Sequence, residues 1–314
     1  MPTKPEVLMI GPYPAWDMED LDARYVVHKL WEAADLDRLF EAHRDSIRAI
    51  ATRGELGASA DLMKRLPALE IVSCYGVGTD AIDLSHAKAN GIRVTNTPGV
   101  LTADVADMAV ALLLAVARKI SQADRFVREG GWAKGSMPLV TRVSGKTVGI
   151  VGMGRVGAAV AKRLAAFDCE VAYFDVSGRA DLPYEFVPDL AELARRTEFL
   201  IVTLAGGAST KGIVNASVFD ALGPDGIFIN VSRGSTVDEA ALLRSLEAKA
   251  IKGAGIDVFW NEPNIDDRLK NLDNAVLQPH HASGTTETRR AMGKLVRDNL
   301  AAHFAGADLL TPVV

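Results

Sequence analysis

Three side chains that could do acid–base or anion-binding chemistry follow apolar segments in the last third of the sequence: Arg233, Glu262 and His280. Arg233 comes shortly after a strand-like apolar run, where a guanidinium can bind a carboxylate or a keto oxygen through two hydrogen bonds. His280 can deliver a proton near neutral pH, and a carboxylate such as Glu262 beside it would stabilise the imidazolium. Taken singly, each has an ordinary structural alternative: an ion pair, a surface glutamate and a capping histidine.

A glycine-rich segment, Gly152-Met153-Gly154-Arg155-Val156-Gly157, could bind the diphosphate of a dinucleotide. The pattern alone is a weak signal, but here an apolar strand precedes it and a helix follows it. Gly152 would allow the tight turn, Gly154 the approach of the backbone to the pyrophosphate, and Gly157 the close packing of helix on strand. Backbone N–H groups and the dipole at the helix start would then attract the diphosphate.

The next predicted strand ends at Asp175, whose carboxylate could accept hydrogen bonds from the ribose hydroxyls of the adenosine. The same carboxylate would repel a 2′-phosphate, which favours NAD(H) over NADP(H). Ser177 and Arg179 follow within four residues and could hold that phosphate, or they could be ordinary polar loop residues. The sequence therefore predicts an NAD(P)(H) site in which Asp175 favours NAD(H) and NADP(H) stays open.

Strands and helices alternate along two stretches of the chain, which predicts parallel sheets covered by helices on both faces. In the first stretch we expect strands at 7–10, 47–52, 71–75 and 92–95 and helices at 21–31 and 60–66. A long apolar helix, buried and ended by two glycines, is expected at 102–128. In the second stretch we expect strands at 147–151, 170–174, 199–203, 226–231, 253–257 and 275–277, and a last helix at 287–304.

The composition limits the classes of function. The chain has 314 residues, 48% hydrophobic and 24% charged, as in a globular protein with a substantial core. A net charge of −5 with scattered basic residues argues against nucleic acid, and no apolar run is long enough for a membrane span. Cys74 and Cys169 lie in apolar stretches and are expected to be buried thiols in a reducing compartment. No signal peptide is evident, so we expect a cytoplasmic protein. We also expect no metal site.

Taken together, the chain resembles the D-isomer-specific 2-hydroxyacid dehydrogenase family. The matching segments keep the family's order and are residues 76–83, 96–100, 148–157, 231–234, 255–259 with Glu262-Pro263, and Pro279-His280. Within the family, the C-terminal part is similar to glyoxylate/hydroxypyruvate reductases and to plant hydroxyphenylpyruvate reductases. One departure is the loop 175–179, because NADP-using relatives tend to carry an Arg-containing loop directly after this strand.

The resemblance implies an α/β fold of two doubly wound parallel-sheet domains. A Rossmann cofactor domain, residues 99–282, would be inserted in a flavodoxin-like substrate-binding domain, residues 1–98 and 283–314. The enzyme would act on CH–OH donors and, in reverse, reduce a small 2-keto acid by hydride transfer from NAD(P)H. His280 would donate the proton to the carbonyl oxygen, Glu262 would hold and tune His280, and Arg233 would bind and polarise the keto acid.

The resemblance also implies further contacts. Backbone N–H groups of Val77 and Gly78 would bind the substrate carboxylate, and Ser283 would lie in the substrate site. His281 could touch the substrate or pack within the protein; packing is favoured, and both roles stay open. The cofactor would contact Thr102, Gly152, Gly154, Arg155, Val156, Gly157, Asp175, Ser177, Arg179, Leu204, Val231 and Asp257, the last near the nicotinamide carboxamide.

Two other readings stay open, and an assembly is expected. The chain could be another dehydrogenase of the family, such as a phosphoglycerate-type enzyme, or a non-enzymatic NAD(H)-sensing, corepressor-like protein. The complete set of Arg233, Glu262 and His280 favours catalysis. The family usually forms homodimers through the cofactor domain, and Trp132 and Met137 would either reach the partner's cleft or pack within their own chain.

Overall fold

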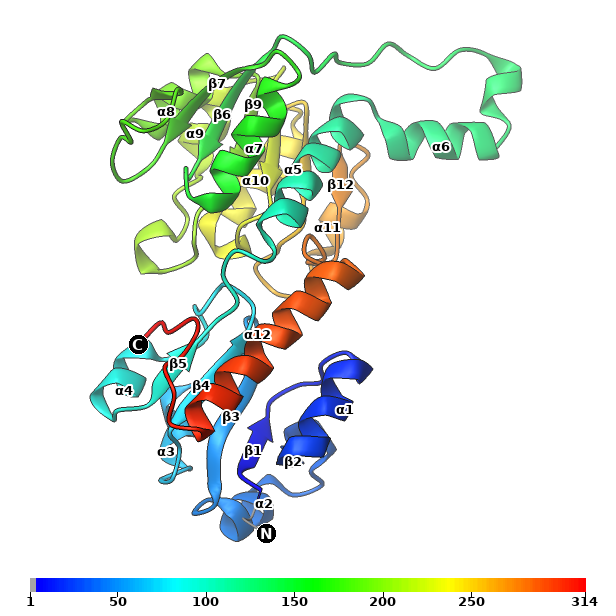
Figure 1. Ribbon diagram of the computed structural model, residues 1–314. Coiled ribbons are helices and arrows are strands. Elements are labelled where there is room, and N and C mark those ends of the chain that lie inside the picture. Colours follow the sequence, from blue (N-terminus) through cyan, green and yellow to red (C-terminus); the bar gives the residue numbers. More distant parts are fainter. Residues whose placement is uncertain (1–3) are drawn as a thin grey trace. The chain divides into compact units, whose positions relative to one another are not determined.

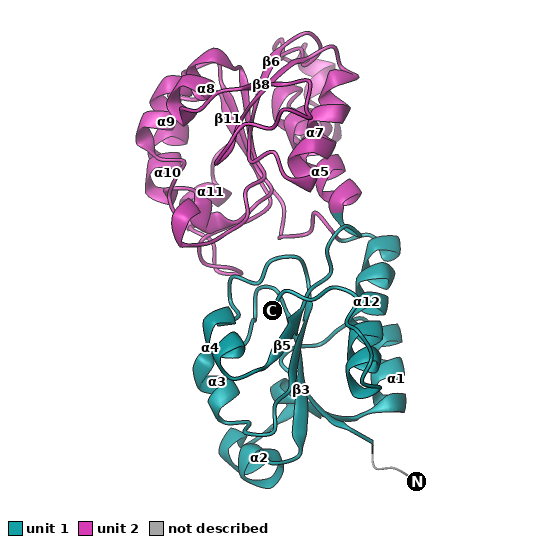
Figure 2. Cartoon of the chain, turned by 60° about the vertical axis from the view of Figure 1, so that its left-hand side comes forward, with its two compact units in different colours: residues 1–101, 284–314 teal, residues 102–283 magenta. Residues whose placement is uncertain are grey.

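The computed structural model describes residues 4–314 and divides into two compact units (Figure 2). Unit 1 comprises residues 1–101 and 284–314, and unit 2 comprises residues 102–283. The chain enters unit 2 once and leaves it once, so unit 2 is an insertion within unit 1. Within residues 4–314, no helix is both long enough and apolar enough to cross a membrane.

Unit 1 contains a five-stranded parallel sheet with the strand order β2-β1-β3-β4-β5. Its strands are β1 (Glu6–Met9), β2 (Val26–Lys29), β3 (Ile47–Arg53), β4 (Ile71–Tyr75) and β5 (Arg93–Thr95). This order is that of the flavodoxin-like doubly wound fold, as the sequence predicted.

Helices cover both faces of this sheet because successive residues of a buried strand point to opposite sides. Val7 and Met9 of β1 pack with α1 (Ala15–Arg24) and α12 (Thr286–Phe304). Leu8, between them, belongs to the cluster on the other face, which includes α2 (Leu36–His43), α3 (Ala60–Lys64) and α4 (Leu84–Ala89). A short 3-10 helix, η1 (Leu30–Glu32), follows β2.

Unit 2 contains a seven-stranded parallel sheet with the order β12-β11-β10-β9-β6-β7-β8. The strands are β6 (Thr147–Val151), β7 (Glu170–Phe174), β8 (Glu185–Phe186), β9 (Phe199–Val202), β10 (Ile227–Asn230), β11 (Gly253–Ile256) and β12 (Ala275–Leu277). From β6 the chain builds one edge and then returns to build the other, beginning with β9. This strand order is that of the Rossmann fold, so the Rossmann prediction is confirmed. Ligands of such sheets bind outside the carboxyl ends of the strands, at the point where the order reverses.

The helices of unit 2 lie on both faces of its sheet (Figure 2). On one face are α5 (Thr102–Ala117) and α7 (Arg155–Ala165), and on the other α8 (Leu190–Arg196), α9 (Ala216–Leu222) and α10 (Glu239–Glu247). The remaining elements are α6 (Ile120–Arg128), α11 (Asp267–Lys270), η2 (Gly131–Lys134), η3 (Ala208–Thr210) and η4 (Gly234–Thr236). Several helices begin at a side chain that accepts hydrogen bonds from the first turn, among them Asp189, Asn215, Asp238 and Asp266.

Two predicted helices are wrong. The stretch 21–31 was expected to be helical, but α1 ends at Arg24 and the β-branched pair Val26-Val27 starts the edge strand β2, which pairs with β1. Pairing with a neighbouring strand outweighs local helix propensity there. The expected helix 102–128 is broken at Lys119, whose φ is +51°, into α5, with seven buried residues, and α6, with none. Both cysteines are buried, as expected.

Candidate active site

The glycine-rich turn joins β6 to α7 at the carboxyl end of β6 (Figure 1). Gly152 has φ +98°, in a region that L side chains rarely adopt, and a Cβ there would lie 2.9 Å from the backbone N of Leu204. A Cβ on Gly157 would lie 2.1 Å from the carbonyl oxygen of Gly152. At Gly154 a Cβ would meet no atom within 4 Å, so packing does not require this glycine. The open backbone at Gly154 fits a site that a ligand approaches closely.

The start of α7 is suited to bind an anion. The helix begins at Arg155, and its first backbone N–H groups have no carbonyl partner within the helix. Its first turn contains no acidic side chain that would compete for the positive end of the helix dipole. Arg155 and Val156 therefore stand where the diphosphate of a dinucleotide would bind.

Asp175 and Arg179 both contact the glycine-rich turn through Met153. The backbone N of Met153 donates to Asp175 Oδ2 over 2.7 Å, and Arg179 Nη1 donates to the carbonyl oxygen of Met153 over 3.0 Å. The Arg179 guanidinium also pairs with Asp181, which holds the pKa of that exposed carboxyl below its usual value. Ser177 is exposed. Asp175 and Arg179, the two residues that could bind the adenosine ribose or its 2′-phosphate, are thus both bonded to the same turn.

Arg233 lies in a tight turn directly after β10. Its guanidinium Nη1 donates to the Ser232 carbonyl oxygen over 2.7 Å. The turn is held by the buried Asn230, whose Oδ1 accepts from the backbone N of Ser232 over 3.0 Å and whose Nδ2 donates to the Arg233 carbonyl oxygen over 3.1 Å. Thr236 Oγ1 donates to the same carbonyl over 2.7 Å. The backbone under Arg233 is therefore held independently of the guanidinium.

His280 follows β12 and has a left-handed backbone conformation, with φ +51°. Such a conformation costs a residue other than glycine about 1–3 kcal/mol unless its surroundings hold it. Here Asp257, directly after β11, holds this conformation through both its backbone carbonyl and its side-chain carboxylate. The backbone N of His280 donates to the Asp257 carbonyl oxygen over 2.8 Å, and the Asp257 carboxylate accepts from the backbone N of His281 and of Ala282 over 2.7 and 3.0 Å.

The carboxylate of Asp257 is almost wholly buried, and this burial raises its pKa, against the lowering effect of the hydrogen bonds from His281 and Ala282. The expected contact of Asp257 with the nicotinamide carboxamide stays a prediction. What the structure shows is that this side chain fixes the turn on which His280 stands.

Glu262 and His280 form the central pair of the site. Glu262 Oε2 lies 2.6 Å from His280 Nδ1, and Glu262 Oε1 accepts from the backbone N of Phe259 over 2.8 Å. Burial acts to raise the pKa of Glu262, but these hydrogen bonds and the positive charges of His280 and Arg233 hold it below its usual value. The carboxylate is thus ionised at neutral pH and its bond fixes Nδ1, which leaves Nε2 as the ring nitrogen available for chemistry.

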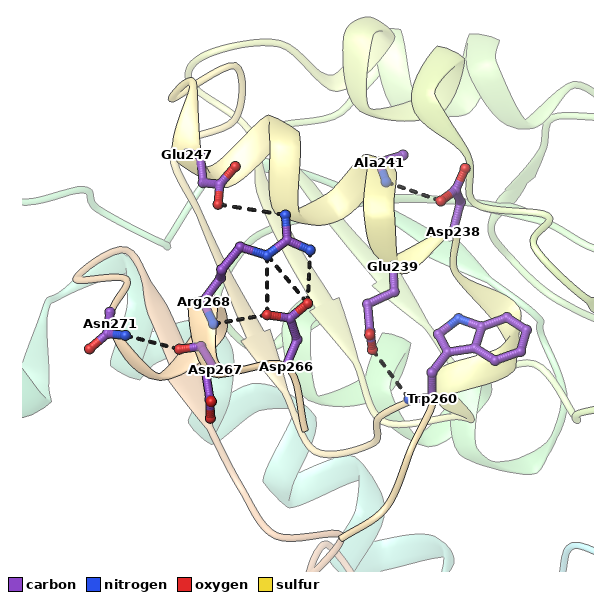
Figure 3. A network of polar contacts seen from close by, with 9 residues as sticks. All are labelled: Asp238, Glu239, Ala241, Glu247, Trp260, Asp266, Asp267, Arg268 and Asn271. Carbon is purple, nitrogen blue, oxygen red and sulfur yellow. Dashed lines mark hydrogen bonds and ion pairs between the residues drawn. The ribbon is translucent and has the colours of Figure 1, made fainter. Parts of the chain in front are cut away.

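The loop that carries Glu262 is anchored on both sides (Figure 3). On one side, Trp260 Nε1 donates to the Val237 carbonyl oxygen over 2.5 Å and the Trp260 backbone N donates to Glu239 Oε2 over 3.3 Å. On the other, Arg268 Nη1 lies 4.0 Å from Glu247 Oε1 of α10, and Arg268 Nη2 donates to Asp266 over 2.8 Å. Hydrogen bonds from Arg268 lower the pKa of Asp266 to about 2. These anchors keep Glu262 in reach of His280.

Most of the remaining predicted residues follow strands, and one begins a helix. Leu204 and Val231 follow β9 and β10, and Thr102 begins α5. Val77 and Gly78 belong to unit 1, in the loop after β4, where the Val77 carbonyl accepts from Asn96 Nδ2 over 2.8 Å.

Ser283 is the last residue of unit 2, although the sequence placed it in the substrate-binding domain. His281 is exposed in this structure, and its role, packing or contact with the substrate, stays a prediction.

Four supporting residues were missed by the sequence analysis: Asn230, Thr236, Glu239 and Trp260. The sequence could have indicated Asn230, because it is a single amide side chain at the end of an apolar strand. Nothing in the sequence connects Trp260 with Val237 and Glu239, because the contact spans more than twenty residues.

Comparison with known proteins agrees with this arrangement. Residues 110–282 match the D-isomer specific 2-hydroxyacid dehydrogenase NAD-binding domain. Glyoxylate/hydroxypyruvate reductase A of Arabidopsis thaliana is 46% identical over 308 residues, which cover 98% of each chain. The chain is similar to a 2-hydroxyacid dehydrogenase structure from Ketogulonicigenium vulgare, with a TM-score of 0.94 and 54% identity over 99% of both chains.

A second solved structure is an NADPH-dependent glyoxylate/hydroxypyruvate reductase from Sinorhizobium meliloti in complex with NADP and malonate. It has a TM-score of 0.93 and 44% identity, and the match covers 99% of this chain and 97% of that one. The likenesses to these relatives and structures cover 98–99% of the chain, and so both sheets. The chain therefore belongs to the D-isomer-specific 2-hydroxyacid dehydrogenase family of NAD(P)-dependent oxidoreductases.

Proposed function

We propose that this protein reduces a small 2-keto acid of the glyoxylate or hydroxypyruvate type to the D-2-hydroxy acid, with NAD(P)H as the reductant. The observation that carries the proposal is the 2.6 Å contact between Glu262 and His280, which follow strands β11 and β12 of the sheet that also bears the glycine-rich turn. Relatives of this family that reduce these two acids support the substrate class.

Each of the three polar residues has a distinct role in the proposed reaction. NAD(P)H, when bound, supplies the hydride that forms the new C–H bond at the keto carbon. His280 gives a proton from Nε2 to the keto oxygen as the C=O double bond becomes a C–O single bond. Arg233 binds the substrate and polarises its carbonyl, and Glu262 stabilises the imidazolium before the proton leaves.

We further propose that unit 2 is the cofactor domain and unit 1 the substrate-binding domain, with boundaries close to residues 98/99 and 282/283. The match of residues 110–282 to an NAD-binding domain supports the first assignment. In unit 1, the backbone N–H groups of Val77 and Gly78 would bind the substrate carboxylate. Their place in the loop after a carboxyl strand end supports this role, because ligands of open α/β sheets bind at that edge.

For the cofactor we propose a preference for NAD(H), because the Asp175 carboxylate is fixed beside the glycine-rich turn and would repel a 2′-phosphate. Arg179 on the same turn supports NADP(H) as the alternative. The deciding experiment is a matrix of glyoxylate, hydroxypyruvate, pyruvate and phenylpyruvate derivatives against NADH and NADPH, with kcat/KM measured for each pair. Equal failure of all keto acids with both cofactors would contradict the proposed activity and favour a sensing protein.

We also propose a cytoplasmic homodimer. Two buried cysteine thiols fit a reducing compartment. The segment formed by α6 and the loop to residue 143 extends from the sheet of unit 2 (Figure 1) and exposes the apolar side chains of Ile120, Val127, Trp132 and Leu139. A partner chain would cover these side chains. Sedimentation equilibrium should give twice the chain mass of 33.5 kDa, and a value near 33.5 kDa would contradict the dimer.

Two glycine substitutions separate cofactor approach from packing. Gly154→Ala adds a Cβ in open space at φ −73°, so stability should stay near that of the parent while NAD(P)H affinity falls by about tenfold or more. Gly157→Ala forces a Cβ against the Gly152 carbonyl and should also lower the free energy of unfolding by about 1–3 kcal/mol. Fluorescence titration and urea denaturation measure the two effects. If the affinity for NAD(P)H were unchanged in Gly154→Ala, the diphosphate would not bind at this turn.

The stability and the activity should both depend on pH through the charge of Glu262. Its pKa is lowered in the folded protein, so its contribution to stability is complete above the unfolded value of 4.5 and is lost as the pH falls through the folded value. Glu262→Gln keeps an acceptor for Phe259 but removes the charge beside His280. We expect kcat at neutral pH to fall by about 10²-fold or less, and the alkaline limb of the reduction profile to move to lower pH. An unshifted limb would argue against the role of Glu262.

A further inference from the structure

Three side chains of metal-ligand type meet at the edge of the sheet in unit 1, outside the proposed active site. Glu6 begins β1, His28 lies in the adjacent edge strand β2, and His43 is the last residue of α2 (Figure 1). Glu6 Oε2 lies 2.7 Å from His28 Nε2 and 3.3 Å from His43 Nδ1. Within residues 4–314, no other group of three His, Cys, Asp or Glu side chains brings its ligand atoms this close together.

The cluster is held by regular structure and is partly buried. The parallel pairing of β1 with β2 places Glu6 opposite Val26 and Leu8 opposite His28, and the two imidazole rings lie 4.1 Å apart between centroids. The side chains of His28 and Glu6 are 12% and 24% exposed, and that of His43 is 40% exposed, so the cluster opens to solvent at His43.

The carboxylate at the centre is ionised under ordinary conditions. Burial acts to raise the pKa of Glu6, but hydrogen bonds from Ser46 and His28 and the charges of both histidines hold it below its usual value. One carboxylate oxygen and two imidazole nitrogens lie within 4.8 Å of one another, and the proposed reaction uses none of them.

We propose that Glu6, His28 and His43 bind a divalent cation of the zinc type, which would join β1, the edge strand β2 and α2. Two imidazole nitrogens and one carboxylate oxygen suit Zn²⁺ and its neighbours Ni²⁺ and Cu²⁺, whereas Mg²⁺ and Ca²⁺ prefer oxygen ligands alone. Tetrahedral bonds of about 2.0–2.1 Å separate ligand atoms by about 3.3 Å. The 3.3 Å distance from Glu6 Oε2 to His43 Nδ1 already has this value, whereas the 2.7 Å distance from Glu6 Oε2 to His28 Nε2 would need to lengthen by about 0.6 Å.

The experiment uses the full chain without an affinity tag, freed of metal by a chelator and titrated with Zn²⁺ in a non-coordinating buffer. We expect one Zn²⁺ per chain and a rise in the unfolding temperature, because the ion binds only the folded arrangement. His43→Gln and Glu6→Gln should each lower the affinity for Zn²⁺ by at least tenfold. His43→Gln is the decisive variant, since its side chain is the most exposed of the three and the metal-free protein should unfold as the parent does.

Two further variants serve as controls. His86→Gln changes a histidine of α4, in the same unit but outside the cluster, and should leave Zn²⁺ affinity unchanged. His280→Gln tests whether the ion sits at the Glu262–His280 pair instead. The proposal is overturned if the parent binds no Zn²⁺, if His43→Gln binds it as the parent does, or if His280→Gln abolishes binding. None of these results depends on whether the protein reduces keto acids.

Discussion

Replacing His280 by glutamine is expected to lower kcat for keto acid reduction by about 10²–10⁴-fold while NAD(P)H still binds with nearly unchanged affinity. Glutamine can keep a polar contact with Glu262, whose Oε2 lies 2.6 Å from His280 Nδ1, but it cannot release a proton to the keto oxygen. The loss should therefore appear in kcat and kcat/KM together. The measurements are steady-state NAD(P)H oxidation and a fluorescence titration of the cofactor.

The matched control is His281→Gln, which changes the adjacent histidine. The His281 side chain is exposed, and its backbone N donates a hydrogen bond to the Asp257 carboxylate. This backbone bond survives the substitution, so kcat should stay within a few-fold of the parent. A His280→Gln variant with near-parental kcat would refute the role of His280 as proton donor, and a loss confined to His281→Gln would move that role to its neighbour.

Arg233→Met should lower kcat/KM for the keto acid by about 10²–10³-fold, comparable to removing one donor that stabilises developing charge on an oxygen. The guanidinium is the group at the end of β10 that can pair with a carboxylate and polarise a carbonyl at once. Because Asn230 and Thr236 hold the turn through backbone atoms, the methionine variant should keep the turn and the Glu262–His280 contact. Substrate kinetics and thermal unfolding together separate these effects.

Arg233→Lys is the informative companion. It retains the positive charge but loses the planar pair of donors, so it should recover only part of the kcat/KM lost in Arg233→Met. Cofactor affinity should be close to that of the parent in both variants. If kcat/KM for Arg233→Met stayed within a few-fold of the parent, Arg233 would be the structural residue that its sequence position alone also allows.

Much of the fold could be predicted because parallel strands buried on both faces leave a continuous apolar signal. Strands such as Ile71–Tyr75 and Phe199–Val202 are short apolar runs ended by polar or glycine residues, and the structure contains both. Prediction failed where neighbours decide the conformation. Val26–Lys29 becomes a strand because β1 offers hydrogen bonds, and the helix after Thr102 breaks at Lys119.

The sequence by itself determined the chemical groups and the edge of the sheet at which they stand. Arg233, Glu262, His280 and the glycine turn all follow apolar strands, and the carboxyl ends of parallel strands share one edge. This follows from the chain because strands joined by helices run parallel through right-handed connections, so their carboxyl ends point to the same edge.

Only the tertiary structure decided how these groups are held. The left-handed φ of His280, its support by Asp257, and the anchoring of the Glu262 loop by Trp260 depend on contacts between strands distant in sequence. The same holds for Glu6, His28 and His43, which carry no metal-binding spacing and meet because β2 adds to the edge of β1. Such contacts arise from packing and pairing between segments distant in sequence, so no pattern within one segment can predict them.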